Sequence, residues 1–258
     1  MERFSLIRHG EKMKAGEERS TVEASGLTGK QQARWKEICE RLHISDPEVT
    51  YRSLEKMETL AQDIFSSLPE RALVIFSTTN YPRTRFTAEY ILESLEDHIR
   101  ESGTKQIYTD TIGESTTDMG IRTTGTSDMP KEAPGMLQLM QRIAQQDQED
   151  DKELSQYISS AGGGKGHARE MELFFTAVNQ DLAREDSILK KRAAQLREEV
   201  LKLKEVVHAN EGLPIFFYGV GHMSSLVALD VALNGRTHYD REDEIPAPLS
   251  LVEANMRV

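Results

Sequence analysis

The sequence predicts an α/β fold with a mostly parallel central sheet and a helical insertion. Three short apolar runs, each bounded by turn residues, indicate the sheet; they cover residues 4–7, 72–76 and 214–218. Continuous apolar runs of this length are typical of strands buried on both faces of a parallel sheet. Helical patterns separate the runs, and strands that alternate with helices indicate right-handed crossovers between parallel neighbours.

The segments between these runs carry apolar residues at helical spacing. The spacing predicts helices at about 29–42, 54–68 and 84–99, and a fourth strand at 106–111. Each helix has one apolar face among charged neighbours, which is the pattern of a helix that packs on a sheet. The order of elements therefore agrees with the alternation that an α/β fold requires.

Residues from about Pro130 to Gly212 break this alternation, because the segment is long, charged and helical in pattern. We expect a single domain spanning residues 1–258, in which this segment is an insertion that covers or flanks the site. Within it, apolar residues recur in steps of four and three, at Leu189, Ala193, Leu196, Val200, Leu203 and Val207. The seam predicts a long helix, about 187–208, that packs inside the domain, and a homodimer through the same helix is the alternative.

Composition excludes several classes of function. The mean hydropathy is −0.54, and no apolar run approaches the ~20 residues of a membrane span, so we expect no membrane insertion. The formal net charge of −11 argues against a broad surface for nucleic acid. The single cysteine, Cys39, has no partner for a disulfide, and no zinc-ligand spacing is present. The first residues do not form a leader pattern, so we expect a cytoplasmic protein.

Two of the apolar runs lead directly into histidines. The first run ends in Arg8-His9-Gly10-Glu11, and the third ends in Gly221-His222. The carboxyl ends of parallel strands meet at one edge of the sheet, where open α/β folds bind ligands. Arg83 follows the second run at the start of a helix, where free N–H groups and the helix dipole favour an anion. These residues therefore predict one anion site with two histidines.

The motifs resemble those of the histidine phosphatase superfamily, also called the phosphoglycerate mutase-like superfamily. The matching pieces occur in the family's order over nearly the whole chain outside the insertion. They are Arg8-His9-Gly10-Glu11, Leu27-Thr28 with Gly29-x-x-Gln32-Ala33, Arg83-Thr84-x-x-Thr87-Ala88-Glu89, and Gly221-His222. The resemblance implies a three-layer phosphoglycerate mutase-like fold. It also implies a reaction that needs neither a metal nor another cofactor.

The resemblance also implies roles for individual residues. His9 would be the catalytic nucleophile that is transiently phosphorylated, and Arg8, Arg83 and His222 would complete the phosphate pocket, with His222 also taking part in catalysis. This agrees with chemistry, since a neutral imidazole is a good nucleophile near neutral pH and guanidinium groups donate bidentate hydrogen bonds to a phosphoryl group.

A general acid must protonate the leaving group. Ile112-Gly113-Glu114 matches the beginning of the family's proton-donor motif, and Asp118-Met119-Gly120 resembles its end. The resemblance therefore implies Glu114 as the general acid, with Asp118 as the substitute. Burial near the phosphate would help to keep such a group protonated.

The implied activity is metal-independent hydrolysis of phosphomonoesters through a phosphohistidine, as in histidine acid phosphatases. The substrate would be a phosphorylated small molecule or a phosphoprotein. Two alternatives stay open: a phosphoglycerate mutase-type phosphotransferase, and a non-catalytic protein that binds a phosphorylated ligand or acts as a scaffold. The residues after Glu11 lack the Ser-x-x-Asn of the mutases, which argues against the first alternative.

Overall fold

The computed structural model describes residues 3–11, 26–112, 167–208, 214–241, 244, 246–249 and 251–255, together with residues 149, 152 and 156. The described strands form one five-stranded sheet in the order β3-β2-β4-β1-β5. Their bounds are β1 (Arg3–Arg8), β2 (Arg71–Thr78), β3 (Gln106–Ile112), β4 (Ile215–Gly221) and β5 (Leu251–Asn255). The first four strands run parallel, and β5 pairs antiparallel with β1.

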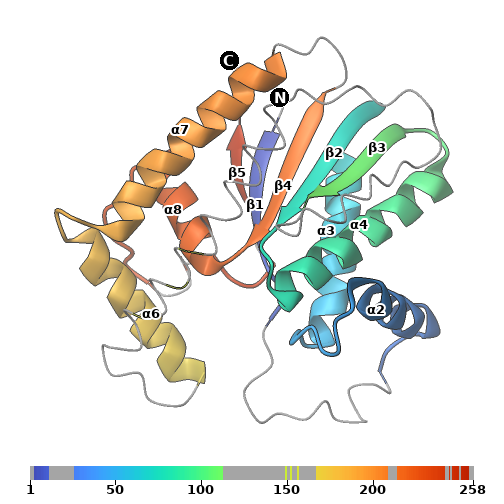
Figure 1. Ribbon diagram of the computed structural model, residues 1–258, viewed down its shortest axis with the longest axis horizontal. Helices are drawn as coiled ribbons and strands as arrows, with labels where there is room; N and C mark the ends of the chain where they lie inside the picture. Colours follow the sequence, from blue (N-terminus) through green and yellow to red (C-terminus); the bar gives the residue numbers. More distant parts are fainter. Residues whose placement is uncertain are drawn as a thin grey trace.

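Helices cover both faces of the sheet and give three layers (Figure 1). One face carries α4 (Pro82–Ser102), with α2 (Gly29–Leu42) and α3 (Arg52–Ser67) packed on it. The other carries α8 (Met223–Asn234), against which α7 (Ile188–His208) and then α6 (His167–Leu182) pack. The predicted α/β fold with a mostly parallel sheet is confirmed.

Each layer boundary has its own apolar core. Between the sheet and α2–α4, fully buried residues such as Val74, Phe76 and Ile91 belong to one continuous cluster. On the opposite side, Val178 and Val227 belong to a smaller cluster formed by α6, α7 and α8. A sheet buried on both faces explains why its strands read as continuous apolar runs.

The apolar seam of α7 is used inside the chain. Leu189, Ala193, Leu196 and Val200 are all buried, and Leu189 and Ala193 belong to the cluster with α6 and α8. The predicted packing of a long helix within the domain is confirmed over these residues. Dimerisation through the same helix stays a prediction.

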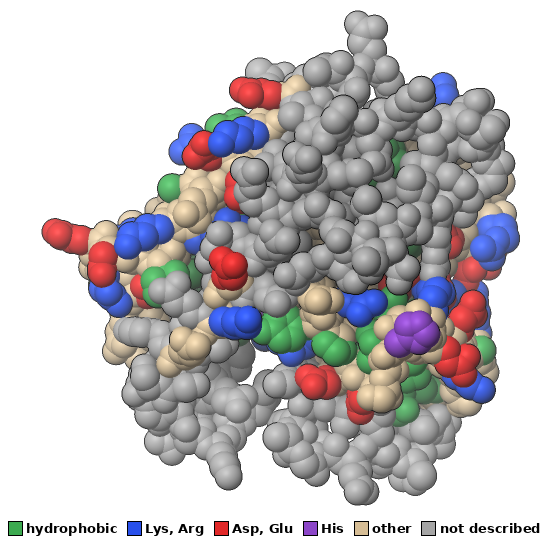
Figure 2. All heavy atoms as spheres, viewed as in Figure 1, with side chains coloured by type: hydrophobic (Ala, Val, Ile, Leu, Met, Phe, Trp, Pro, Cys, Tyr) green, Lys and Arg blue, Asp and Glu red, His purple; other side chains and the backbone are tan. Residues whose placement is uncertain are grey.

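The described part of the insertion consists of residues 167–208, which contain α6 and α7, and of residues 149, 152 and 156. No helix in the described ranges combines the length and apolar character needed to cross a membrane. On the described part of the face drawn in Figure 2, Lys and Arg side chains are interspersed with Asp and Glu side chains. The described side chains on this face therefore carry charges of both signs.

Candidate active site

The register of the parallel strands brings the candidate residues together. Arg8 at the end of β1 pairs with Gly221 of β4, and Val220 of β4 pairs with Thr78 of β2. The residues that follow these strand ends, His9, His222 and Thr79, therefore leave the sheet side by side. The backbone N–H of His9 donates to the carbonyl of Gly221 at 3.1 Å, which continues the pairing one residue beyond β1.

His9 is held with one ring nitrogen fixed and the other directed at a cation. Its Nδ1 lies 2.6 Å from the carbonyl oxygen of Gly10, and only a protonated Nδ1 can donate to a carbonyl. The lone pair is then on Nε2, which accepts a hydrogen bond from Nε of Arg83 at 3.3 Å. The side chain is buried, with 8% of its surface exposed. His9 therefore presents a neutral, oriented Nε2, the form that nucleophilic chemistry needs.

Arg83 is the second residue of α4 and connects the two histidines. Besides its bond to His9, its Nη2 lies 3.5 Å from Nδ1 of His222. The guanidinium stacks over the ring of Tyr81, with 4.6 Å between its central carbon and the ring centroid. Its Nη1 is 3.6 Å from a carboxylate oxygen of Glu48. Contacts on every side fix the planar fork in place, and such a fork suits bidentate binding of a phosphoryl group.

His222 is the N-cap residue of α8, yet its side chain makes no capping hydrogen bond. Instead, Nε2 lies 3.1 Å from Oγ1 of Thr79, and that hydroxyl lies 2.8 Å from Oγ1 of Thr84. Thr84 in turn donates to the carbonyl of Tyr81 at 2.9 Å. A proton on Nε2 satisfies this chain of hydroxyls and leaves the lone pair of Nδ1 facing Arg83.

The environment of His222 favours its neutral form. Burial lowers the pKa of His222 well below its usual value, and a positive charge on His9, when that ring is protonated, lowers it further, as do the charges of Arg83 and Arg8. Only 1% of the residue is exposed, so the charged form would lose its hydration. His222 is therefore neutral at neutral pH, in agreement with the proton positions that its partners require.

Arg8 lies beside this group with its head tied to the C-terminal part of the chain. Its Nη1 donates to the carbonyl of Pro246 at 2.7 Å, and its own carbonyl accepts from the N–H of Leu249 at 3.1 Å. Burial lowers the pKa of Arg8 to about 10, which leaves the guanidinium charged at neutral pH. Arg8 thus adds a fixed positive charge close enough to His222 to influence its protonation.

The backbone around Gly10 is closely packed. A Cβ added at Gly10 would lie 2.7 Å from Cε of Met57 and 2.7 Å from Cγ1 of Val49, so only glycine fits there. The N–H of Gly10 donates to Oγ1 of Thr87 on α4, and the N–H of Glu11 donates to Oγ of Ser53 on α3. Two helices therefore hold the turn that carries His9.

Two helix N-termini begin at this edge of the sheet. The helix α4 starts at Pro82, after residues 79–81 that follow the end of β2 at Thr78, and α8 starts at Met223, directly after His222. The first turns of helices have free N–H groups and a partial positive charge, both of which favour an anion. The arrangement thus combines two arginines, two neutral histidines and two positive helix ends, and this suits a phosphoryl group.

Most of the predicted site residues lie together, and others fall outside the described ranges. His9, Arg83 and His222 are in mutual contact, and Arg8 is next to them. Glu114 and Asp118 lie outside the described residues. The sequence did not single out three residues that contact the group: Thr79, Tyr81 and Glu48. Thr79 and Tyr81 follow the β2 run, which marks their place at the sheet edge but not their partners, whereas nothing in the sequence around Glu48 marks it.

Two cavities lie near these elements. A small one of about 20 Å³, room for about one water molecule, lies behind the strand ends, and Thr79, Gly221 and Ser225 line it with Arg192 and Leu196 of α7. Arg192 and Leu196 of α7 therefore lie next to the strand ends that carry Thr79 and His222; whether the whole insertion covers or flanks the site stays a prediction.

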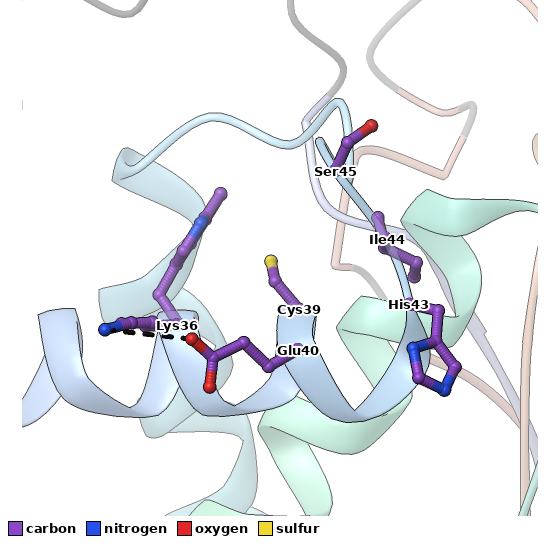
Figure 3. A pocket seen from close by; sticks show the side chains of 7 residues that line it. Lys36, Cys39, Glu40, His43, Ile44 and Ser45 are labelled. Atoms are coloured by element: carbon purple, nitrogen blue, oxygen red, sulfur yellow. Dashed lines mark ion pairs between the residues drawn. The ribbon is translucent and has the colours of Figure 1, made fainter.

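A larger hollow of about 420 Å³ lies on α2 and the loop after it. Figure 3 shows the side chains that line it, among them Cys39 and His43, with Lys36 paired to Glu40 at 3.7 Å. It shares no residue with the histidine and arginine group, and its one lysine is already paired. The larger hollow therefore does not combine the cations that a phosphoryl group needs. Within the described ranges, no three His, Cys, Asp or Glu side chains gather as they would around a metal ion.

No protein-family model matches the sequence, and no curated protein matches it. Solved structures do align with the chain. The mycobacterial glucosyl-3-phosphoglycerate phosphatase in complex with VO3 aligns over 98% of this chain and 90% of its own, at 14% identity and a TM-score of 0.40. The phytase from D. castellii aligns over 96% of this chain and 64% of its own, at 12% identity and a TM-score of 0.41.

A third structure is the phosphoserine phosphatase from Entamoeba histolytica in complex with 3-phosphoglyceric acid. It aligns over 98% of this chain and 90% of its own, at 14% identity and a TM-score of 0.37. The three aligned structures are thus described as two phosphatases and a phytase. At TM-scores of 0.37 to 0.41 these alignments carry no conclusion about this chain, whose chemistry depends on its own side chains.

Proposed function

We propose that the protein is a phosphomonoester phosphatase of the histidine phosphatase type, which acts through a phosphohistidine on His9 and without a metal ion. One observation carries the proposal. Arg83 donates from Nε to Nε2 of His9 and directs Nη2 at Nδ1 of His222, so a nucleophile, a cation and a second histidine surround one point. In the proposed site, Arg8, Arg83 and His222 bind the phosphoryl oxygens.

The first chemical step transfers the phosphoryl group to the protein. Nε2 of His9 attacks phosphorus, a P–N bond forms, and the bond between phosphorus and the ester oxygen breaks. The leaving oxygen takes a proton from the general acid, and an alcohol departs. Fixed guanidinium groups and helix N-termini stabilise the charge on the equatorial oxygens.

The second step returns the enzyme to its starting form. Water attacks phosphorus, the P–N bond breaks, and inorganic phosphate forms. The deprotonated general acid accepts the proton of the water, so that the acid and Nε2 of His9 both regain their initial state. Splitting the hydrolysis into two transfers through one nucleophile lowers the barrier of each step.

We assign the general acid to Glu114, with Asp118 as the substitute, on the motif resemblance. Esters with different leaving groups show by experiment which of the two residues is the general acid. The p-nitrophenolate group of p-nitrophenyl phosphate leaves without protonation, because it is a stable anion. The alkoxide of an alkyl phosphate has to be protonated as it leaves. The Glu114→Gln variant should lose far more kcat/KM with the alkyl ester than with the aryl ester, by about 10²-fold. The same pattern in Asp118→Asn, and not in Glu114→Gln, would transfer the role to Asp118.

Turnover of p-nitrophenyl phosphate tests the activity directly. The wild-type protein should release inorganic phosphate, and His9→Ala should not. His238→Ala is the matched control, because His238 is exposed by 59% and contacts no residue of the site. Equal turnover by wild type and His9→Ala would contradict the proposed role of His9 as the nucleophile. Reappearance of the phosphoryl group on a sugar acid, in place of free phosphate, would favour the mutase.

A further inference from the structure

The loop between α2 and α3 holds a carboxylate against the candidate phosphate site. An oxygen of Glu48 lies 3.6 Å from Nη1 of Arg83. Glu48 has a φ of 57°, a left-handed conformation that costs energy in any residue other than glycine. Its N–H donates to Oδ1 of Asp46 at 2.7 Å, which stabilises this turn. The backbone is therefore held in a strained form that brings the carboxylate to Arg83.

The chain on the far side of Glu48 is anchored to the segment that carries His9. Val49 is fully buried, with its Cγ1 against the backbone of Gly10. The N–H of Thr50 donates to the carbonyl of Glu11 at 2.9 Å. Because these two residues are fixed, the position of Glu48 relative to His9 is fixed as well.

Burial shows which side of the site Glu48 occupies. The side chain of Glu48 is 51% exposed, and that of Arg83 is 13% exposed. On the inner side, His222 and Thr79 are each only 1% exposed, so the sheet closes the site there. The rest of a phosphomonoester bound at Arg83 and His9 would extend toward the exposed side, on which the carboxylate of Glu48 lies.

We propose that Glu48 is a specificity-determining residue that selects substrates by the charge of their leaving group. The inference rests on the proposed phosphatase function. A substrate with a cationic group near the ester, such as an amino alcohol phosphate, is favoured, and one with a second anionic group is disfavoured. For two charges ~7 Å apart at the edge of a protein, the effect on kcat/KM is roughly three- to fiftyfold for each ester.

This role differs from that of a general acid. Glu48 pairs as a carboxylate with a guanidinium, whereas a general acid has to hold a proton for the leaving group. The role also differs from neutralisation of Arg83 alone, which would change all esters by the same factor. Selection by charge changes the ratio between two esters of opposite charge.

The test uses two esters of similar size, phosphoethanolamine and phosphoglycolate. The wild-type protein should prefer phosphoethanolamine in kcat/KM. Glu48→Gln, which keeps the shape and removes the charge, should lower this preference by the product of the two effects, roughly tenfold to a thousandfold or more, and Glu48→Lys should reverse it. Glu40→Gln is the control. Glu40, like Glu48, is an exposed glutamate in an ion pair, but its partner is Lys36 and it lines the larger hollow on α2. Its ratio should equal that of the wild type.

A ratio that stays within twofold of wild type in Glu48→Gln overturns the inference, and so does an equal change in both esters. If the wild-type protein hydrolyses neither of these esters nor p-nitrophenyl phosphate, the proposed phosphatase function has failed on its own. The Kd values of the same two esters, measured by calorimetry, then decide. A loss of the preference in Glu48→Gln supports charge selection by a binding site, and an unchanged Kd ratio rejects it.

Discussion

Nε of Arg83 donates a hydrogen bond to Nε2 of His9 across 3.3 Å. This bond places a cation on the lone pair of the proposed nucleophile and fixes the direction of that lone pair. A phosphoryl group that binds at Arg83 then lies close to Nε2, and it has to displace the N–H of Arg83 from that lone pair before the lone pair attacks phosphorus. Preorganised donors of this kind stabilise a transition state without the cost of reorienting solvent.

Replacement of Arg83 by lysine should lower kcat/KM for p-nitrophenyl phosphate by about 10²- to 10³-fold. Lysine keeps the charge but loses the planar fork that contacts His9 and His222 together. Arg85→Lys is the matched control, since Arg85 lies two residues further along the same helix, and it should behave like wild type. Steady-state kinetics decides, and an Arg83→Lys variant with wild-type kcat/KM would show that the fork is not needed.

Replacement of Thr79 by valine should loosen His222. The hydroxyl of Thr79 accepts from Nε2 of His222, and valine leaves that N–H buried without its acceptor, at a cost of about 1–3 kcal/mol. We expect a fall in kcat of about tenfold or more and a lower free energy of unfolding. Thr59→Val, on the exposed side of α3, should change neither quantity greatly. Unchanged kcat in Thr79→Val would show that His222 does not depend on this hydroxyl.

Stability should fall as the pH drops below about 6.5. Burial lowers the pKa of His222 in the folded state, so the unfolded chain binds a proton at a higher pH than the folded chain does. The stabilising contribution is complete above the unfolded pKa and is lost as the pH falls from there toward the folded value. The slope reaches at most about 1.4 kcal/mol per pH unit.

Urea unfolding between pH 7.5 and 5 measures this slope. His222→Gln should flatten it relative to wild type, because glutamine does not titrate. Identical slopes in the two proteins would mean that His222 is not held neutral in the folded state.

Substitution of Gly10 by alanine should destabilise the fold. The added methyl group would lie 2.7 Å from side-chain atoms of Met57 and Val49, and overpacking of this kind costs about 1–3 kcal/mol. Gly29→Ala is the control, because nothing lies within 4 Å of its added Cβ. Denaturant unfolding should separate the two variants, and equal stabilities would argue against close packing at the His9 turn.

The sequence was sufficient to predict the place of the site residues that directly follow a strand or begin a helix. His9 and His222 follow apolar runs, and parallel strands have to bring such positions to one edge. Arg83 follows from the start of α4. The strand β5 was not predicted, because a short antiparallel edge strand with Glu253 and Asn255 in it lacks a continuous apolar run.

Other site residues depend on tertiary structure. Thr79 becomes a partner of His222 only through the register between β2 and β4, which hydroxyl residues in a sequence do not reveal. Glu48 lies in an irregular loop, and its contact with Arg83 occurs with a positive φ at Glu48 that a sequence does not reveal. Glu114 and Asp118 follow β3 at a spacing that the motif alone leaves open.

The central claim is that His9 carries the phosphoryl group, and direct detection of that intermediate tests it. The wild-type protein is mixed briefly with a ³²P-labelled phosphomonoester, denatured in alkali and separated from free label. The account predicts label that survives alkali, is lost in acid and is absent from His9→Ala but present in His238→Ala. Equal labelling of His9→Ala, or turnover of the ester with no acid-labile label on the wild-type protein, would contradict it.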